Sequence, residues 1–125
     1  MIVDGRFRFA TGGVYAPSAR EYAELARKVE DLGYATLLIP DHFEEQLAPF
    51  PALLAAANAT HALRVGTYVC DNDFRHPAVL AKDAATVDLL TDGRLELGLG
   101  AGYLWDPIMR RPAFRSTKRE CGSAG

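Results

Sequence analysis

Cysteine is scarce in this 125-residue chain, and its scarcity excludes two kinds of architecture. Cys70 and Cys121 lie far apart and form no C-x-x-C pair, so the sequence predicts neither a disulfide framework nor a thiolate zinc site. Long apolar runs are missing too, and none approaches the roughly 18 residues that span a bilayer. No basic and then apolar leader opens the chain. We therefore expect a cytoplasmic protein that does not enter a membrane.

An excess of positive charge is also missing. The 14 Lys and Arg against 16 Asp and Glu leave a net charge of −2, which gives no reason to expect nucleic acid or an anionic membrane as a partner. The charge is unevenly spread, because residues 1–106 carry 9 basic and 15 acidic side chains whereas residues 107–125 carry 5 and 1. The second stretch has no apolar period. We predict one domain over 1–106 and a basic, irregular, disordered tail over 107–125.

Strand and helix patterns alternate regularly along the first hundred residues. Strands are expected at residues 6–10, 34–39, 63–69 and 95–99, and helices from Ser18 to Leu32, from Pro51 to Thr60 and from Pro77 to Leu90. Ser18 and Glu21 have capping-box spacing, Gly33 suits a helix stop, and Pro77 suits a first turn. The apolar residues expected to face inward are Tyr22, Leu25, Ala26, Val29 and Leu32 in the first helix and Val79, Leu80, Ala84, Val87 and Leu90 in the third.

The spacing of these units indicates the fold class. Strands recur at intervals of about 28 to 30 residues, which is the length of one βα step in a parallel sheet. The class is therefore α/β, built from parallel (β/α) units. Two architectures fit this order: half of a closed TIM barrel, or a small open doubly wound sheet.

Polar or glycine residues follow three of the expected strands, at the ends where ligands bind in both architectures. Asp41-His42 follows the second strand, Cys70-Asp71-Asn72-Asp73 the third, and Gly98-x-Gly100-Ala101-Gly102 the fourth. His42 is a candidate proton donor or acceptor because an unperturbed imidazole titrates near neutral pH. The small residues of the third group would let a flat ring lie against the strand end.

Two other chemistries fit these residues poorly. The glycines are spaced G-x-G-x-G rather than G-x-G-x-x-G, and no convincing helix follows them, so a dinucleotide site of the Rossmann type is disfavoured. A hydrolytic metal centre needs clustered His and carboxylate ligands, but the chain has no H-x-H and no H-E-x-x-H, and we predict no metal site. His61 and His76 are interpreted as structural.

Six phrases of the sequence, in this order and spacing, resemble the luciferase-like monooxygenase family, especially its coenzyme F420-dependent branch. They are Glu30-Asp31-Leu32-Gly33-Tyr34, Pro40-Asp41-His42-Phe43, Leu63-Arg64-Val65-Gly66-Thr67, Arg75-His76-Pro77, Leu80-Ala81-Lys82-Asp83-Ala84-Ala85-Thr86, and Asp92-Gly93-Arg94-Leu95-Glu96-Leu97-Gly98-Leu99-Gly100-Ala101-Gly102. The resemblance covers roughly residues 5 to 103.

The resemblance implies a cofactor site and a reaction. It places Asp41, Asn72 and Gly100 beside the tricyclic ring of the cofactor, with His42 as the catalytic acid or base. It further implies a bulge after the third strand with a non-prolyl cis peptide bond at Tyr68-Val69, against which the ring lies. The implied cofactor is F420, with FMN as the alternative, and the implied reaction is hydride transfer to or from a small organic substrate.

The length of the chain bears on that activity. A complete TIM barrel typically needs about 250 residues, so the resemblance implies only the N-terminal half of one. We expect a truncated form with impaired or no activity, whose outer strands lack partners and which self-associates as a homo-oligomer. The alternatives are an FMN-dependent monooxygenase and a non-catalytic, self-associating half-barrel.

Overall fold

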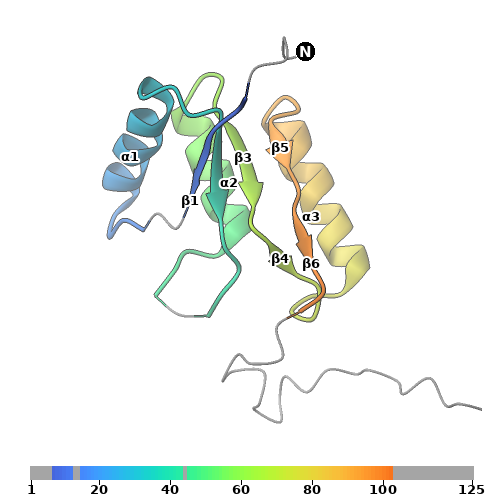
Figure 1. Ribbon diagram of the computed structural model, residues 1–125. Coiled ribbons are helices and arrows are strands. Elements are labelled where there is room, and N and C mark those ends of the chain that lie inside the picture. Colours follow the sequence, from blue (N-terminus) through green and yellow to red (C-terminus); the bar gives the residue numbers. More distant parts are fainter. Residues whose placement is uncertain (1–6, 13–14, 44, 103–125) are drawn as a thin grey trace, which may run out of the picture.

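A computed structural model describes residues 7–12, 15–43 and 45–102 of the chain (Figure 1). The strands are β1 (Ala10–Gly12), β2 (Thr36–Ile39), β3 (Arg64–Thr67), β4 (Cys70–Asp71), β5 (Leu95–Glu96) and β6 (Leu99–Gly100), and the helices are α1 (Ala19–Asp31), α2 (Pro49–Ala59) and α3 (Pro77–Leu90). Among the described residues, no helix combines the length and apolarity that crossing a membrane requires. The predicted basic tail lies outside the described residues.

The strands form a parallel sheet in sequential order. Four of them pair as β1-β2-β3-β5, and β4 and β6 pair parallel just beyond the carboxyl ends of β3 and β5. A right-handed crossover between sequential neighbours always places its helix on the same side of the sheet, and α1, α2 and α3 indeed cover one face (Figure 1). A doubly wound sheet carries helices on both faces. The structure therefore selects the partial barrel from the two expected architectures.

The core lies between this sheet and the helices. Leu37 of β2 and Val65 of β3 are partners in register, and both are fully buried. The helical residues that cover them are Tyr22, Ala26 and Val29 of α1, Leu53, Ala56 and Ala57 of α2, and Leu80, Ala84 and Val87 of α3. The Tyr22 hydroxyl donates to the carbonyl oxygen of Ala52 at 3.2 Å, and burial raises the pKa of Tyr22 to about 12. This bond joins α1 to α2 within an otherwise apolar layer.

The predicted helix signals are confirmed with two adjustments. The Ser18 hydroxyl oxygen accepts from the N–H of Glu21 at 3.2 Å, and the same hydroxyl donates to the Glu21 carboxylate at 2.7 Å. The carboxylate thus holds the capping hydroxyl rather than a backbone N–H. Gly33 ends α1 with a φ of 86°, a left-handed conformation that suits glycine. Pro77 begins α3 as predicted, whereas α2 begins two residues earlier than expected, at Pro49.

Some apolar residues expected to face inward lie at the surface. Leu32, Val79 and Leu90 are 65%, 52% and 56% exposed. α3 packs through a narrow stripe at helical spacing, and Val79 and Leu90 lie beside that stripe. Leu32 is the C-cap of α1 and therefore lies past the last turn that packs.

The expected strands also differ from those observed. The first begins later, at Ala10, so that Phe7 and Phe9 precede it and are exposed, while Arg6 lies outside the described residues. The second begins two residues later than expected, at Thr36. The last two are interrupted: the expected strand 63–69 is broken after Thr67, and the strand 95–99 is broken after Glu96. The two breaks lie beside each other in the sheet. Before them β3 pairs with β5, and beyond them β4 pairs with β6.

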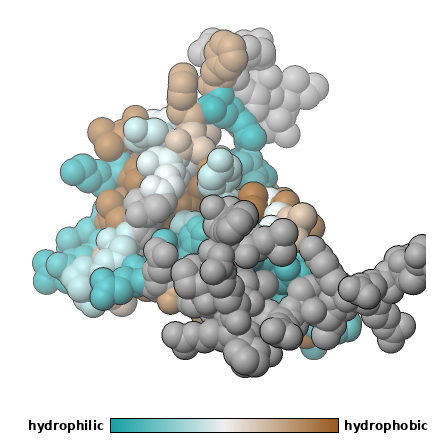
Figure 2. Space-filling model, turned by 60° about the horizontal axis from the view of Figure 1, so that its bottom comes forward, coloured by the Kyte–Doolittle hydropathy of each residue, from teal (hydrophilic) through white to brown (hydrophobic). Residues whose placement is uncertain are grey.

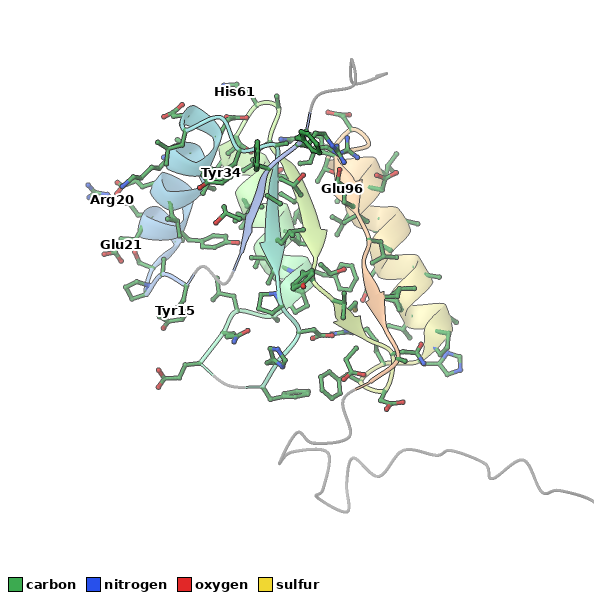
Figure 3. All side chains as sticks on the ribbon, in the orientation of Figure 1. Tyr15, Arg20, Glu21, Tyr34, His61 and Glu96 are labelled. Atoms are coloured by element: carbon green, nitrogen blue, oxygen red, sulfur yellow. The ribbon has the colours of Figure 1, made fainter. Side chains whose placement is uncertain are left out.

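One carboxylate ties the strands together at the amino end of the sheet, where Figure 3 shows Glu96. Glu96 of β5 accepts hydrogen bonds from Arg64 Nε of β3 at 2.7 Å and from the Thr36 hydroxyl of β2 at 3.0 Å. Arg8, just before β1, forms an ion pair with it at 2.8 Å. The group of Arg8, Thr36, Arg64 and Glu96, the amino-end cluster, thus bridges the sheet from β1 to β5 on the face that carries no helices.

Candidate active site

A hollow of about 310 Å³ opens at the carboxyl ends of β2, β3 and β6. The residues that line this strand-end hollow are Asp41, His42, Tyr68, Val69, Asp71, Gly100, Ala101 and Gly102. A second hollow of about 420 Å³ continues toward β1 and shares His42 and Tyr68 with the first. Figure 2 turns this end of the molecule forward, and polar and apolar residues intermingle over the surface that is not grey. Parallel sheets bind their ligands at this end.

A bulge between β3 and β4 supplies one wall of the hollow. The peptide bond Tyr68-Val69 is cis, as the sequence resemblance implies. The bulge stays attached to its neighbours through its backbone, because the N–H of Tyr68 donates to Ile39 at 2.9 Å and the N–H of Cys70 donates to Gly98 at 2.8 Å. Tyr68 and Val69 are 70% and 42% exposed. They are therefore directed away from the core and line the hollow.

Asp41 lies below the opposite wall, directly after β2. Its side chain is only 6% exposed, and its carboxylate accepts the N–H of Asp71 at 2.8 Å and both terminal nitrogens of Arg75, one of them at 3.1 Å. Burial opposes ionisation, but the hydrogen bonds and charge of Arg75 together with the Asp71 amide outweigh it and hold the pKa of Asp41 below its usual value. Asp41 is therefore a charged carboxylate whose oxygens are already bonded within the protein.

Arg75 connects Asp41 to two further elements. Its guanidinium also donates to the sulfur of Cys70 in β4 and lies 5.7 Å from the centre of the Phe50 ring at the start of α2. Hydrogen bonding to Asp41 raises the pKa of Arg75 further. Burial raises the pKa of Cys70 to about 11, so its thiol stays protonated at neutral pH. Cys70 is a packed partner of Arg75 here and not a nucleophile.

His42 follows Asp41 and is the titratable side chain best placed to meet a ligand. It is exposed and lines both hollows. Within the described part of the chain, its imidazole makes no hydrogen bond, so both ring nitrogens can meet a bound molecule. Phe43, the next residue, packs edge to face against Phe74 with ring centroids 4.6 Å apart. This aromatic pair joins the loops after β2 and β4 beside the hollow.

Gly100 lets the Val69 side of the hollow approach the end of β6 closely. A Cβ built on it would lie 2.5 Å from Cγ2 of Val69, so any side chain at this position would displace the wall of the hollow. Asn72 donates its backbone N–H to the carbonyl oxygen of Gly100 at 3.2 Å. The Asn72 side chain is exposed and is not among the lining residues.

The structure brings together most of the residues that the sequence singles out. Asp41, His42, Tyr68, Val69 and Gly100 line one hollow, and Asn72 adjoins it through its backbone. No role for Arg75 is predicted from the sequence. No local pattern marks it, because its partner Asp41 lies 34 residues earlier in the chain.

Comparison with known proteins agrees with the family resemblance of the sequence. Residues 4–111 match the family model described as luciferase-like monooxygenase. A curated relative, the F420-dependent glucose-6-phosphate dehydrogenase of Kribbella flavida, is 37% identical over 97 residues, which are 71% of this chain and 29% of the relative. The chain thus spans less than a third of the length of that relative.

Solved structures of similar proteins give the same fold. The coenzyme F420-dependent tetrahydromethanopterin reductase from Methanopyrus kandleri superimposes with a TM-score of 0.69 at 27% identity, over 77% of this chain and 27% of the reductase. The monooxygenase RslO1 from Streptomyces bottropensis gives a TM-score of 0.70 at 30% identity, over 86% of this chain and 36% of the monooxygenase. These neighbours are TIM-barrel enzymes, and the chain matches about a third of each.

Proposed function

Because this chain belongs to the luciferase-like monooxygenase family, we propose that it forms the N-terminal part of an F420-dependent oxidoreductase whose strand-end hollow takes the tricyclic deazaflavin ring. The reaction is the transfer of a hydride between that ring and a small organic substrate, in the cytoplasm. One observation carries the proposal: His42, the Tyr68-Val69 bulge and Gly100 meet around a single hollow. The names of the Kribbella relative and of the Methanopyrus reductase both include F420, which supports the choice of cofactor.

The residues of the hollow fit a flat aromatic ring. Tyr68 and Val69 offer exposed apolar surface, and Gly100 has no side chain that would push Val69 out of its place in the wall. The described lining includes no Lys or Arg, so this part of the site suits an uncharged ring rather than a phosphate group. In barrels, phosphates are often held by the loops after strands seven and eight, which are not among the described residues.

His42 has the proposed chemical role. When bound, the deazaflavin supplies the carbon that gives or accepts the hydride. His42 holds or takes the proton that accompanies this transfer, and its exposed imidazole faces the ligand space. We expect His42→Ala to abolish any F420-dependent turnover while His61→Ala, at the far end of the sheet, preserves it. Turnover that survives His42→Ala would contradict the role.

A binding titration tests the proposal without knowledge of the substrate. F420 added to the purified protein should show saturable quenching of its fluorescence, and Gly100→Ala should weaken the binding about tenfold, or 1.4 kcal/mol, by displacing Val69. His61→Ala is the matched control, since the His61 side chain is 96% exposed and far from the hollow. Absence of saturable binding, or binding that Gly100→Ala leaves unchanged, would refute the proposed cofactor site.

FMN-dependent monooxygenation is the second candidate, favoured by the likeness to the Streptomyces monooxygenase. The ring system of FMN has the same flat tricyclic shape, so the same hollow would receive it. Parallel titrations decide between the two. Tighter binding of FMN than of F420 would favour the monooxygenase.

We also propose that the chain self-associates. β1 and β5 are the outer strands of the four-stranded sheet, and Phe7, Phe9, Leu97 and Leu99 near these edges are 41% to 91% exposed. A twofold axis parallel to the strands would pair β5 of one copy with β1 of the other in parallel, on both sides. Light scattering after size exclusion should give twice the chain mass of 13.6 kDa. A monomer would exclude this pairing.

A further inference from the structure

The sheet divides at its carboxyl end. β2 and β3 pair as far as Ile39 and Thr67, and beyond the bulge β4 pairs with β6 instead. The backbone of β4 is therefore no longer a ladder partner of β2. The Asp41 carboxylate takes the place of the missing ladder bond, because it accepts the N–H of Asp71 at 2.8 Å.

Arg75 holds that carboxylate in place from the loop after β4. Its fork contacts both oxygens of Asp41 while it also touches Cys70 and Phe50. The guanidinium therefore joins the loop that carries it to three other segments: the end of β2, the strand β4 and the start of α2. The Arg75 side chain is 21% exposed, so little water competes for these bonds.

The residues joined in this way are the neighbours of the proposed reactive groups. Asp41 precedes His42, and Cys70 and Asp71 directly follow the bulge that supplies Tyr68 and Val69. If Asp41 moved, His42 on one side of the hollow and the Tyr68-Val69 bulge on the other would each lose a fixed neighbour. The side chain of Arg75 itself does not line the hollow.

We propose that Arg75 is a positioning residue of the site, which acts through Asp41 and Cys70 to set the placement of His42 opposite the Tyr68-Val69 bulge. This inference rests on the proposed function for its importance, but its test does not depend on cofactor binding. Asp41 in turn is a support for the hollow, since its oxygens are engaged by Arg75 and Asp71.

Nuclear magnetic resonance of the full chain provides the first readout. In Arg75→Ala, the His42 ring signals and the amides of Val69 and Asp71 should shift or broaden, while the ring signals of His61 stay in place. Arg75→Lys keeps the charge but not the fork, so it should restore these signals only in part. Arg20→Ala is the matched control, because Arg20 pairs with Glu24 on the outer face of α1 (Figure 3) and its side chain is 88% exposed.

A second readout connects the effect to the ligand. F420 affinity should fall about tenfold or more in Arg75→Ala and remain unchanged in Arg20→Ala. If the unaltered protein binds no F420, the proposed function fails while the His42 signals still decide the role of Arg75. Unchanged His42, Val69 and Asp71 signals in a folded Arg75→Ala or Arg75→Lys protein would overturn the inference. If Arg75→Ala does not fold, the Lys variant alone decides by the same criterion.

Discussion

At the amino end of the sheet, Glu96 is bound by Arg8, Arg64 and Thr36, whereas at the carboxyl end Asp41 is bound by Arg75 and the amide of Asp71. The Glu96 side chain is 28% exposed and that of Asp41 is 6% exposed. Both carboxylates have pKa values lowered by these hydrogen bonds, against the opposing effect of burial. A carboxylate bound by arginine thus lies at each end of the sheet, but the two carboxylates differ in burial.

The burial of each carboxylate decides how much its ion pair contributes to stability. The amino-end cluster spans a continuous sheet, and water reaches its charges, so the loss of one contact is partly replaced by solvent. At the carboxyl end, β4 pairs with β6 rather than with β2, and the Asp41 carboxylate is buried. Loss of Arg75 would therefore leave a buried charge without a partner. The comparison indicates that the amino end adds stability in small amounts, while the carboxyl end depends on one ion pair that also shapes the hollow.

Removal of the arginine at each end should give the largest difference. Arg75→Met should lower the free energy of unfolding by about 3 to 5 kcal/mol, because it leaves the Asp41 carboxylate buried without its cation. Arg64→Met should cost only about 1 kcal/mol, because Glu96 keeps Arg8 and Thr36. Urea unfolding of both variants checks this. Equal losses would show that the two ends do not differ in the way described.

Glycine substitutions sharpen the comparison at a smaller scale. A Cβ at Gly66 would lie 2.4 Å from the carbonyl oxygen of Glu96, so Gly66→Ala forces the backbones of β3 and β5 apart and should cost about 1 to 3 kcal/mol. At Gly100 the nearest atom belongs to the Val69 side chain, which can turn away, so Gly100→Ala should cost less stability and yet weaken ring binding. Thermal unfolding read beside the F420 titration separates the two effects. A stable Gly66→Ala protein would indicate that the strands give way easily.

A neutral residue in the amino-end cluster should have a smaller effect. Glu96→Gln keeps the size of the side chain but loses the charge that binds Arg8 and Arg64, and we expect a loss of about 1 kcal/mol at pH 7. Chemical denaturation at low salt measures it, and high salt should reduce the difference. A loss as large as that of Arg75→Met would contradict the minor role assigned to this end.

The acid limb of stability should show the smallest difference. The backbone N–H groups of His61, Ala62 and Leu63 donate to the Glu30 carboxylate and, against the effect of burial, lower its pKa. Asp41, Glu30 and Glu96 thus all have folded-state pKa values below their usual ones, so their contribution is complete above the unfolded pKa of about 4 and is lost as pH falls through the lower, folded values. The gap between the unaltered protein and Glu96→Gln should therefore close as pH falls from about 5 toward 3. Unfolding curves measured across this pH range test the prediction. A stability difference that grows as pH falls would contradict the predicted direction.

Much of the fold was predictable because its signals are local. The cap at Ser18, the left-handed Gly33 and the helix start at Pro77 each depend on neighbours within four residues. The interruptions after Thr67 and Glu96 were not visible as patterns, since both stretches read as uninterrupted strands and the change of partner appears only in the sheet pairing. Only the family resemblance indicated the cis bond at Tyr68-Val69.

The residues of the site also differ in how well the sequence predicts them. His42 and Gly100 could be identified because they follow strands, and topology brings strand ends together. The bond from Arg75 to Asp41 spans 34 residues and joins two different loops, so no local pattern marks it. The exposure of Leu32, Val79 and Leu90 was also missed, because helical spacing identifies an apolar stripe but not how much of it a neighbouring element covers.

Chemical-shift mapping with F420 tests the central claim most directly, because it reports on both ends of the sheet in one experiment. We predict that added F420 shifts the amides of Tyr68, Val69 and Gly100 and leaves those of Thr36, Arg64 and Glu96 unchanged. Shifts centred on the amino-end cluster, or no saturable shifts at any residue, would contradict the assignment of the strand-end hollow as the cofactor site.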